Sequence, residues 1–357
     1  MIVFGDIADR SIVVCCGSGG VGKTTTAAAI ALEGARRGRR ACVVTIDPAK
    51  RLADALGLDS LTNAPGLVDG SWPGSLYALM LDTKTTFDDL VRRYAGSEEQ
   101  ASSILSNRMY RNIAGALSGT QEYMAMEKLY ELSASGSFDL IVVDTPPTRN
   151  ALDFLDAPRR ITRFLDNRVF RLLMLPTRAY LRAVGVATQA FFRTISRVVG
   201  SEVVSDAVAF FQAFSGMEQG FRDRADAVLR LLASPGTAFV LVTSPRRDAV
   251  EEASFFASRL GEGGIGVDGL VVNRLHPSFG GGAVSGGDVF ASNLRDFRAI
   301  ASREEEHFSA LAARVSPAPV ARVPFLADDV HDVDGLLAVG SFLFAGAAGG
   351  APSNWRQ

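Results

Sequence analysis

The residue types best suited to chemistry lie in one glycine-rich stretch near the N-terminus, residues 17–25, which reads GSGGVGKTT. It matches the pattern G-x-x-x-x-G-K-[ST], in which the backbone N–H groups of a loop surround a polyphosphate. Lys23 could then reach the outer phosphates, and the Thr24 hydroxyl could bind Mg²⁺, which prefers oxygen ligands. The alternative is a turn without a ligand, because glycine is common in this chain, at 35 of 357 residues.

The segments on either side of this loop are those that the pattern requires. An apolar run at 11–16 predicts a buried strand before it, and the apolar positions within 27–37, ended by Gly38, predict a helix after it. The N-terminus of a helix adds partial positive charge to the N–H groups of the loop. The residues expected to hold the phosphates are Gly17, Gly19, Gly20, Val21, Gly22, Lys23, Thr24 and Thr25.

Two aspartates follow apolar runs of the kind that form buried parallel strands. Asp47 comes after the run 41–46, and Asp144 comes after the run 139–143. A carboxylate at the carboxyl end of a strand beside the phosphate loop can orient water or approach Mg²⁺. For Asp47, capping of the following helix is an equal alternative. Asp144 has the context of a Walker B aspartate, which we expect to meet the magnesium shell.

The composition of the chain argues against several other classes of function. A formal net charge of −2 provides no global field that would attract nucleic acid, so no nucleic-acid partner is expected. Cys15, Cys16 and Cys42 lie on predicted core strands without a C-x-x-C pair, and neither a zinc site nor a redox motif is expected. This cysteine usage, with no visible signal peptide, indicates a reducing, cytoplasmic location.

The order of the remaining patterns predicts an α/β fold with a helical insertion. Further short apolar runs predict strands at 76–81, 238–242, 269–272 and 319–323. Helical patterns at 84–135 and 157–232 predict an inserted helical subdomain. The strands before and after it are expected to form one sheet, so that residues 1–357 make a single domain. Residues 345–357 are expected to be a disordered tail.

The helical stretch 157–232 begins with a strongly basic part. Between residues 157 and 200 there are nine arginines and a single acid, Asp166, with aromatic and aliphatic side chains among them. Such a segment can lie on an anionic membrane, bind a hydrophobic partner, or form a subdomain with a solvated basic face. The solvated face is the plainer interpretation. A hydrophobic client and a peripheral membrane contact remain alternatives.

Five motifs, in this order along the chain, resemble those of the arsenite-pump ATPase family, which also includes the tail-anchored-protein targeting ATPases. They are the loop at 17–25, Asp-Pro-Ala at 47–49, Asp-Thr-Pro-Pro-Thr at 144–148, Val-Val-Asn at 271–273 and Val-Pro at 323–324. The resemblance covers nearly the whole chain, and within the family the sequence looks most like the actinobacterial anion-transporter-like ATPases. It implies a P-loop NTPase fold with a mostly parallel sheet of seven or eight strands flanked by helices, and ATP with magnesium at a dimer interface.

The resemblance also implies roles for individual residues. Asp47 looks like the residue that polarises the attacking water, with Lys23 as the second catalytic group and Asp144 as the Walker B carboxylate near magnesium. Asn273 matches the residue that reads the adenine edge, and Pro324 begins the loop that packs on the base. The implied reaction is transfer of the terminal phosphoryl group to water, in which the protein mainly positions groups and neutralises charge.

The sequence departs from the family pattern at four places. Ser18 stands where the family has a signature lysine that reaches across the dimer to the partner's nucleotide. Loss of a cation of this arginine-finger type can cost several powers of ten in rate. Residues 146–150 read PPTRN instead of APTGH, and Lys50 replaces a histidine. Residues 277–288 lack the C-x-x-C that gives some members a zinc-bridged dimer, and no metalloid-binding set of cysteines is present.

These departures separate the functional hypotheses. The first is a dimeric ATPase that opens and closes with its nucleotide state, with a paralogous partner chain supplying the lysine missing at Ser18. The second is a nucleotide-gated targeting module, with slow or no hydrolysis, that binds a hydrophobic client or a membrane through 157–232. Arsenite pumping is disfavoured, because thiolates are the soft ligands that a metalloid prefers and the three cysteines are strand residues.

Overall fold

The fold was analysed in a computed structural model of the chain. The residues that it describes are 4–47, 50–108, 110, 120–146, 157, 159–160, 162–163, 165–166, 201–277, 279 and 289–344. The chain forms two compact units, the first made of residues 1–81, 131–152 and 233–357, and the second of residues 82–130 and 153–232. The predicted tail at 345–357 and most of the basic segment, 167–200, lie outside the described residues.

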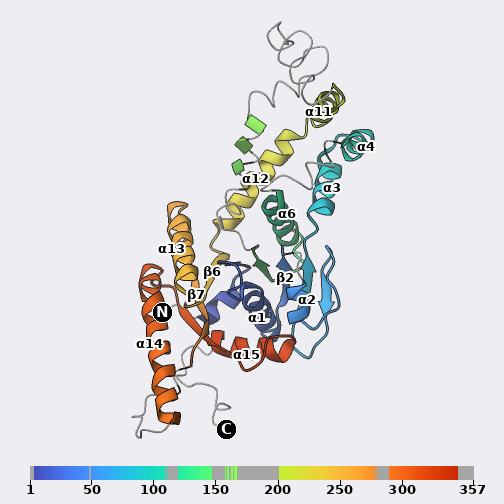
Figure 1. The fold of residues 1–357 in the computed structure, drawn as a ribbon. Coiled ribbons are helices and arrows are strands. Elements are labelled where there is room, and N and C mark those ends of the chain that lie inside the picture. The colour runs from blue at the N-terminus through green and yellow to red at the C-terminus, as the bar shows by residue number, and fades with distance from the viewer. Residues whose placement is uncertain are drawn as a thin grey trace. The chain divides into compact units, whose positions relative to one another are not determined.

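An eight-stranded sheet forms the centre of the first unit (Figure 1). The strands are β1 (Ile12–Cys16), β2 (Arg40–Thr45), β3 (Gly66–Val68), β4 (Ser75–Met80), β5 (Leu140–Asp144), β6 (Thr237–Thr243), β7 (Gly269–Leu275) and β8 (Val320–Pro324). Their order is β3-β4-β2-β5-β1-β6-β7-β8, and every neighbouring pair is parallel except β3 with β4. The predicted α/β class with a mostly parallel sheet is confirmed.

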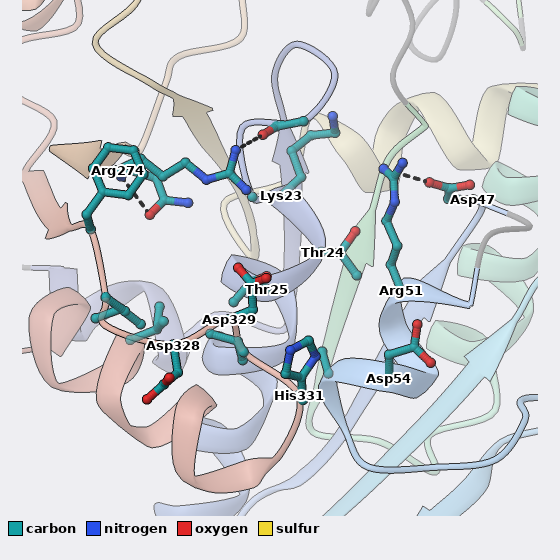
Figure 2. A pocket seen from close by; sticks show the side chains of 18 of the residues that line it. Lys23, Thr24, Thr25, Asp47, Arg51, Asp54, Arg274, Asp328, Asp329 and His331 are labelled. Carbon is teal, nitrogen blue, oxygen red and sulfur yellow. Dashed lines mark hydrogen bonds and ion pairs between the residues drawn. The ribbon is translucent and has the colours of Figure 1, made fainter.

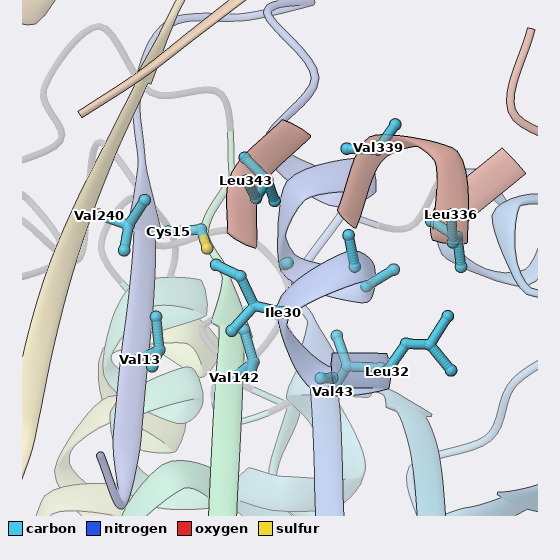
Figure 3. Packing of buried hydrophobic residues seen from close by; sticks show 14 of the residues in the cluster. Val13, Cys15, Ile30, Leu32, Val43, Val142, Val240, Leu336, Val339 and Leu343 are labelled. Carbon is cyan, nitrogen blue, oxygen red and sulfur yellow. The ribbon is translucent and has the colours of Figure 1, made fainter. Parts of the chain in front are cut away.

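The central strands are buried along their whole length, as the continuous apolar runs predict. All five residues of β1 and of β5 are buried, and so are all seven of β6. Helix α1 (Lys23–Arg36) packs on one face of this sheet, and α15 (Val333–Phe344) packs against α1. Figure 3 shows Ile30 and Leu32 of α1 between strand residues and the α15 side chains Leu336 and Val339. This packing holds the start of α1 rigidly beside the end of β1.

The other helices of the first unit complete the layers around the sheet. They are the 3₁₀ helix η1 (Phe4–Asp9), α2 (Arg51–Ala55), α13 (Arg247–Glu262) and α14 (Val289–Arg314). The connections from β1 to β2 and from β6 to β7 run in opposite directions along the sheet. Right-handed crossovers therefore place α1 on one face and α13 on the other.

The three cysteines lie inside the sheet, as predicted. Cys15, Cys16 and Cys42 are buried and form no disulfide. Burial raises the pKa of the Cys16 thiol to about 12 and that of Cys15 well above its ordinary value. Since the thiolate is the reactive form, both groups are inert at neutral pH.

The second unit is helical. Its described helices are α3 (Thr83–Tyr94), α4 (Glu98–Ser106), α6 (Thr120–Ala134, which runs into the first unit after residue 130), α11 (Ser201–Ala213) and α12 (Glu218–Leu232). The ring of Tyr94 packs on Phe221, and the partly buried Arg224 forms an ion pair with the buried Glu127 at 3.0 Å. Contacts of this kind join α3, α6 and α12.

None of the described helices is both long and apolar enough to cross a membrane. A hydrophobic client or membrane contact through 157–232 remains a prediction, because residues 167–200 lie outside the part of the chain that the structure describes.

Candidate active site

The glycine-rich loop leaves the sheet at its topological switch point. Strand β1 lies between β5 and β6, so the chain leaves β1 on one side of the sheet and later continues from β6 toward the other. Ligands of open α/β sheets bind at such points, outside the carboxyl ends of the strands. The loop is therefore where the fold itself favours a ligand.

Two loop positions cannot carry a side chain. At Gly17 (φ +150°) a Cβ would lie 2.0 Å from the Val242 carbonyl oxygen. At Gly22 (φ +94°) it would lie 2.2 Å from the Asn273 amide nitrogen. Since L-residues rarely adopt these backbone angles and both spaces are filled, glycine is required at each position. Helix α1 then begins at Lys23, within the motif at 17–25 and four residues before the predicted helix at 27–37.

Lys23 points back into the loop. Its buried ammonium group donates to the Ser18 carbonyl oxygen at 2.7 Å. Burial lowers the pKa of Lys23, while the charge of Asp144 opposes this change. The hydroxyl of Ser18 is itself buried and has no hydrogen-bond partner among the described residues. Lys23 thus holds the loop in shape and needs only to change acceptor to bind a phosphate.

Asp144 lies at the end of β5, directly beside the loop. It pairs in register with Cys15 of β1 on one side and Thr45 of β2 on the other. One carboxylate oxygen, Oδ2, accepts from the Thr24 hydroxyl at 2.7 Å and from the Thr45 hydroxyl at 2.9 Å. The other, Oδ1, is buried without a partner in the described part of the chain. A buried oxygen of this kind requires an explanation, and the water shell of a bound cation provides one.

Burial also changes the acidity of Asp144. It raises the pKa of this carboxyl to about 6, against the lowering effect of the Thr24 and Thr45 hydroxyls. A rise of this size corresponds to about 3 kcal/mol. The unliganded protein therefore carries a destabilised carboxylate at neutral pH.

This destabilisation predicts a pH-dependent difference between the wild type and Asp144→Asn. Between about pH 4 and pH 6 the unfolded chain loses the Asp144 proton while the folded chain keeps it, so raising the pH favours unfolding. The wild-type free energy of unfolding should fall, relative to that of the variant, by about 2 kcal/mol between pH 4 and pH 7. Urea titrations without nucleotide or Mg²⁺ measure this difference. A difference that stays constant with pH would contradict the raised pKa.

Asp47 follows β2, and hydrogen bonds to Thr45 link it to Asp144. Its backbone N–H donates to the Thr45 hydroxyl at 3.2 Å, and this hydroxyl in turn donates to Asp144. The Asp47 carboxylate pairs with Arg51 at 3.4 Å. The N-cap residue of α2 is Lys50. Asp47 is therefore not the cap of that helix.

A cavity of about 570 Å³ brings most of the predicted site residues together (Figure 2). The predicted residues that line it are Gly20, Gly22, Lys23, Thr24, Thr25, Asp47, Asn273 and Pro324. A second cavity of about 400 Å³ is lined by Ser18, Gly19 and Val21 instead. Three residues line both cavities, namely Gly20, Arg274 and Phe325. Gly17 and Asp144 line neither cavity. The larger cavity is within the usual size range of small-molecule sites.

Asn273 holds the loop as well as facing the cavity. Its amide nitrogen donates to the Val21 carbonyl oxygen at 2.9 Å, and its side-chain oxygen accepts the Arg274 backbone N–H at 2.9 Å. Arg274 has a left-handed backbone (φ +62°) and donates to the Gly20 carbonyl oxygen at 2.9 Å. These two contacts leave one amide hydrogen and one oxygen lone pair of Asn273 for other partners.

Several residues of the site were not predicted from the sequence. Thr45 links the two aspartates, Arg51 pairs with Asp47, and Arg274 holds the loop. The segment after β8 adds Asp328, Asp329 and His331 to the cavity wall. A hydroxyl residue two places before Asp47 was the one local signal that could have indicated Thr45.

Comparison with known proteins agrees with this geometry. The model of the anion-transporting ATPase family matches residues 10–345. The chain belongs to this family. The assignment made from the five motifs is therefore confirmed, and the predicted enzyme class, an ATPase, agrees with the description of the family.

Individual relatives of this family are similar at a moderate level. The chain is 27% identical over 260 residues to ATPase GET3A of Arabidopsis thaliana, covering 72% of this chain and 65% of that protein. It is 32% identical over 270 residues to the uncharacterized protein SCO2128 of Streptomyces coelicolor, covering 73% and 61%. ATPase get3 of Aspergillus terreus is 31% identical over 150 residues, covering 42% and 43%. The chain thus spans between 43% and 65% of the length of these relatives.

Proposed function

We propose that this chain binds ATP in the 570 Å³ cavity and hydrolyses it to ADP and phosphate. The observation that carries the proposal is the Thr24 hydroxyl at 2.7 Å from Asp144, whose other carboxylate oxygen is buried and unpartnered among the described residues. A hydroxyl and a carboxylate meet there at the mouth of a phosphate loop. This pairing is the one that a nucleotide with Mg²⁺ requires.

The triphosphate would lie along the loop and the first turn of α1. The N–H groups of the loop and the N-terminus of α1 attract the phosphates. Lys23 would exchange the Ser18 carbonyl oxygen for a phosphate oxygen. Asn273 and Pro324, which line the same cavity, are our candidates for contacts to the base.

The residues present are suited to Mg²⁺, although no group of three or more His, Cys, Asp or Glu side chains that could hold a metal occurs in the described residues. This ion usually keeps several waters and takes its other ligands from phosphates and one or two side chains. Thr24 would supply a direct oxygen ligand, and Asp144 and Asp47 would contact its waters. When bound, Mg²⁺ neutralises charge on the phosphates.

Hydrolysis is the attack of water on the terminal phosphorus. A bond forms between the water oxygen and that phosphorus, the bond to the bridging oxygen breaks, and ADP, phosphate and one proton result. The carboxylate of Asp47 would orient the water and accept its proton, which then passes to solvent. Lys23 would neutralise charge on the outer phosphates.

We further infer that the working form is a cytoplasmic dimer, and that its partner is a paralogous chain. Ser18 supplies no charge to the loop, and it lines the second cavity of about 400 Å³. This cavity has room for a long side chain from another molecule. A lysine from a paralogous ATPase would restore the missing cation.

This proposal predicts that a partner raises the turnover of the chain. The chain alone should hydrolyse ATP slowly, and a mixture with a paralogous ATPase that carries the signature lysine should do so at least about tenfold faster, because the transition state gains a cation. Phosphate release measured for each chain and for the mixture tests this. The matched control is the partner with its signature lysine replaced by alanine. Equal and fast rates for the chain alone and the mixture would contradict the heterodimer.

A further inference from the structure

The cavity carries a second cation near Lys23. Arg51, the first residue of α2, lines the cavity, and a guanidinium nitrogen, Nη1, lies 3.4 Å from the Asp47 carboxylate. Figure 2 shows its side chain extending from α2 past Thr24 toward Asp47. Lys23, Thr24 and Asp47 are the residues proposed above for the reacting phosphate. Arg51 therefore lies at the reacting end of the cavity.

The negative charges expected at the reacting end of the cavity outnumber the positive ones, so another cation there would be favourable. A nucleoside triphosphate carries about four negative charges at neutral pH, and Asp47 and Asp144 add their own carboxylates. Lys23 contributes one positive charge and Mg²⁺ two. Phosphoryl transfer is stabilised by positive groups held in advance around the terminal phosphate. Among the described residues, Arg51 is the arginine beside Asp47.

The guanidinium of Arg51 can make more contacts than it does here. It has five N–H donors in a planar fork, and its pair with Asp47 is long, at 3.4 Å. The side chain is 61% exposed. An exposed pair of this kind contributes little to stability, so the group can turn or take a second partner at small cost. Arg274, which also lines the cavity, instead donates to the Gly20 carbonyl oxygen.

We propose that Arg51 binds the terminal phosphate of a nucleoside triphosphate with the N–H donors that Asp47 does not use. It would act as a cation supplied by the chain itself, as an arginine finger does in cis. The pair with Asp47 would then hold both groups on the same side of the phosphate. This inference rests on the proposed function and adds to it a residue that distinguishes triphosphate from diphosphate.

The test compares two nucleotides rather than one. Calorimetry with Mg²⁺ measures the affinities for the slowly hydrolysed analogue ATPγS and for ADP, in the wild type, Arg51→Ala and Arg51→Lys. Arg51→Ala should weaken ATPγS binding about tenfold, which is the loss of one charge-assisted contact, and leave ADP binding within about twofold. Arg51→Lys, which keeps the charge, should recover part of the loss. The control is Arg36→Ala, which removes another exposed arginine paired with a carboxylate, Glu33, in the same unit.

The possible outcomes separate this inference from the proposed function. If Arg51→Ala weakens both nucleotides equally, or neither, the terminal-phosphate role of Arg51 is wrong while nucleotide binding stands. If the wild-type chain binds neither nucleotide, the proposed function itself fails, and this inference with it. Thermal unfolding of each variant shows whether the fold is intact, and the comparison of ATPγS with ADP in one sample does not depend on the folded fraction.

Discussion

An Asp47→Asn variant is expected to bind ATP about as tightly as the wild type and to hydrolyse it about 10²-fold to 10⁴-fold more slowly. The amide has the shape of the carboxylate but cannot accept a proton from the attacking water. The backbone N–H of Asp47 still reaches the Thr45 hydroxyl, so the loop after β2 keeps its anchor. The carboxylate pair with Arg51 is lost, but Arg51 is largely exposed and this pair contributes little to stability.

The measurement should separate binding from chemistry. Single-turnover hydrolysis gives the rate of the chemical step, and calorimetry with ATPγS gives the affinity. Asp9→Asn is the matched control, because Asp9 is an exposed partner of an arginine, Arg37, at 3.2 Å in the same unit. We expect it to leave both quantities unchanged. An Asp47→Asn variant with the wild-type single-turnover rate would show that another group orients the water.

Much of the fold was predictable because its signals are local. Each central strand is a run of consecutive apolar residues, as a strand buried on both faces requires, and a motif of fixed spacing joins β1 to α1. The position of Asp144 beside the loop follows from parallel pairing, which brings the carboxyl ends of β1, β2 and β5 to one edge. Strand β3 was missed because it is a three-residue, antiparallel edge strand with Gly66 and Leu67 exposed.

The unpredicted parts of the site depend on contacts between residues far apart in the sequence, or on the direction that a side chain takes. Asn273 reaches Val21 across 252 positions of sequence, so its contact with the loop has no local signal. The sequence supported two roles for Asp47 equally, a cap of the following helix and a functional group of the site. The structure excludes it as the N-cap of α2, because that position belongs to Lys50. Arg51 is four residues after Asp47, but the spacing alone does not tell a surface ion pair from a group directed into a cavity.

The site also shows where function opposes stability. A buried carboxylate destabilises the unliganded fold at neutral pH, more so when one oxygen has no partner, and Asp144 is buried with Oδ1 unpartnered among the described residues. Such a group is expected where a ligand later completes its contacts. Lys23, by contrast, already has an acceptor in the Ser18 carbonyl oxygen. In the proposed function the loop is therefore held in shape before nucleotide binds, while the contacts of Asp144 are completed only when the ligand is bound.

A Ser18→Lys variant is expected to hydrolyse ATP about 10-fold to 10³-fold faster than the wild-type chain when each is measured alone. The new lysine would restore the cation that the family uses across its dimer, and groups of this type are worth about 10³ or more in rate. The substitution breaks no side-chain hydrogen bond among the described residues, since the Ser18 hydroxyl has no partner there. Ser18 also lines the 400 Å³ cavity.

Two features of the measurement make this prediction specific. Ser18→Met adds a side chain of nearly the same length without charge, and it should leave the rate at the wild-type value. A lysine that acts across a dimer makes the rate per chain rise with chain concentration, whereas one that acts within its own chain gives a constant rate. Faster hydrolysis without concentration dependence would assign the lysine to its own nucleotide and contradict action across a dimer. An unchanged rate in a variant that still dimerises would show that charge at position 18 does not limit turnover, and that the slow step lies elsewhere in the site.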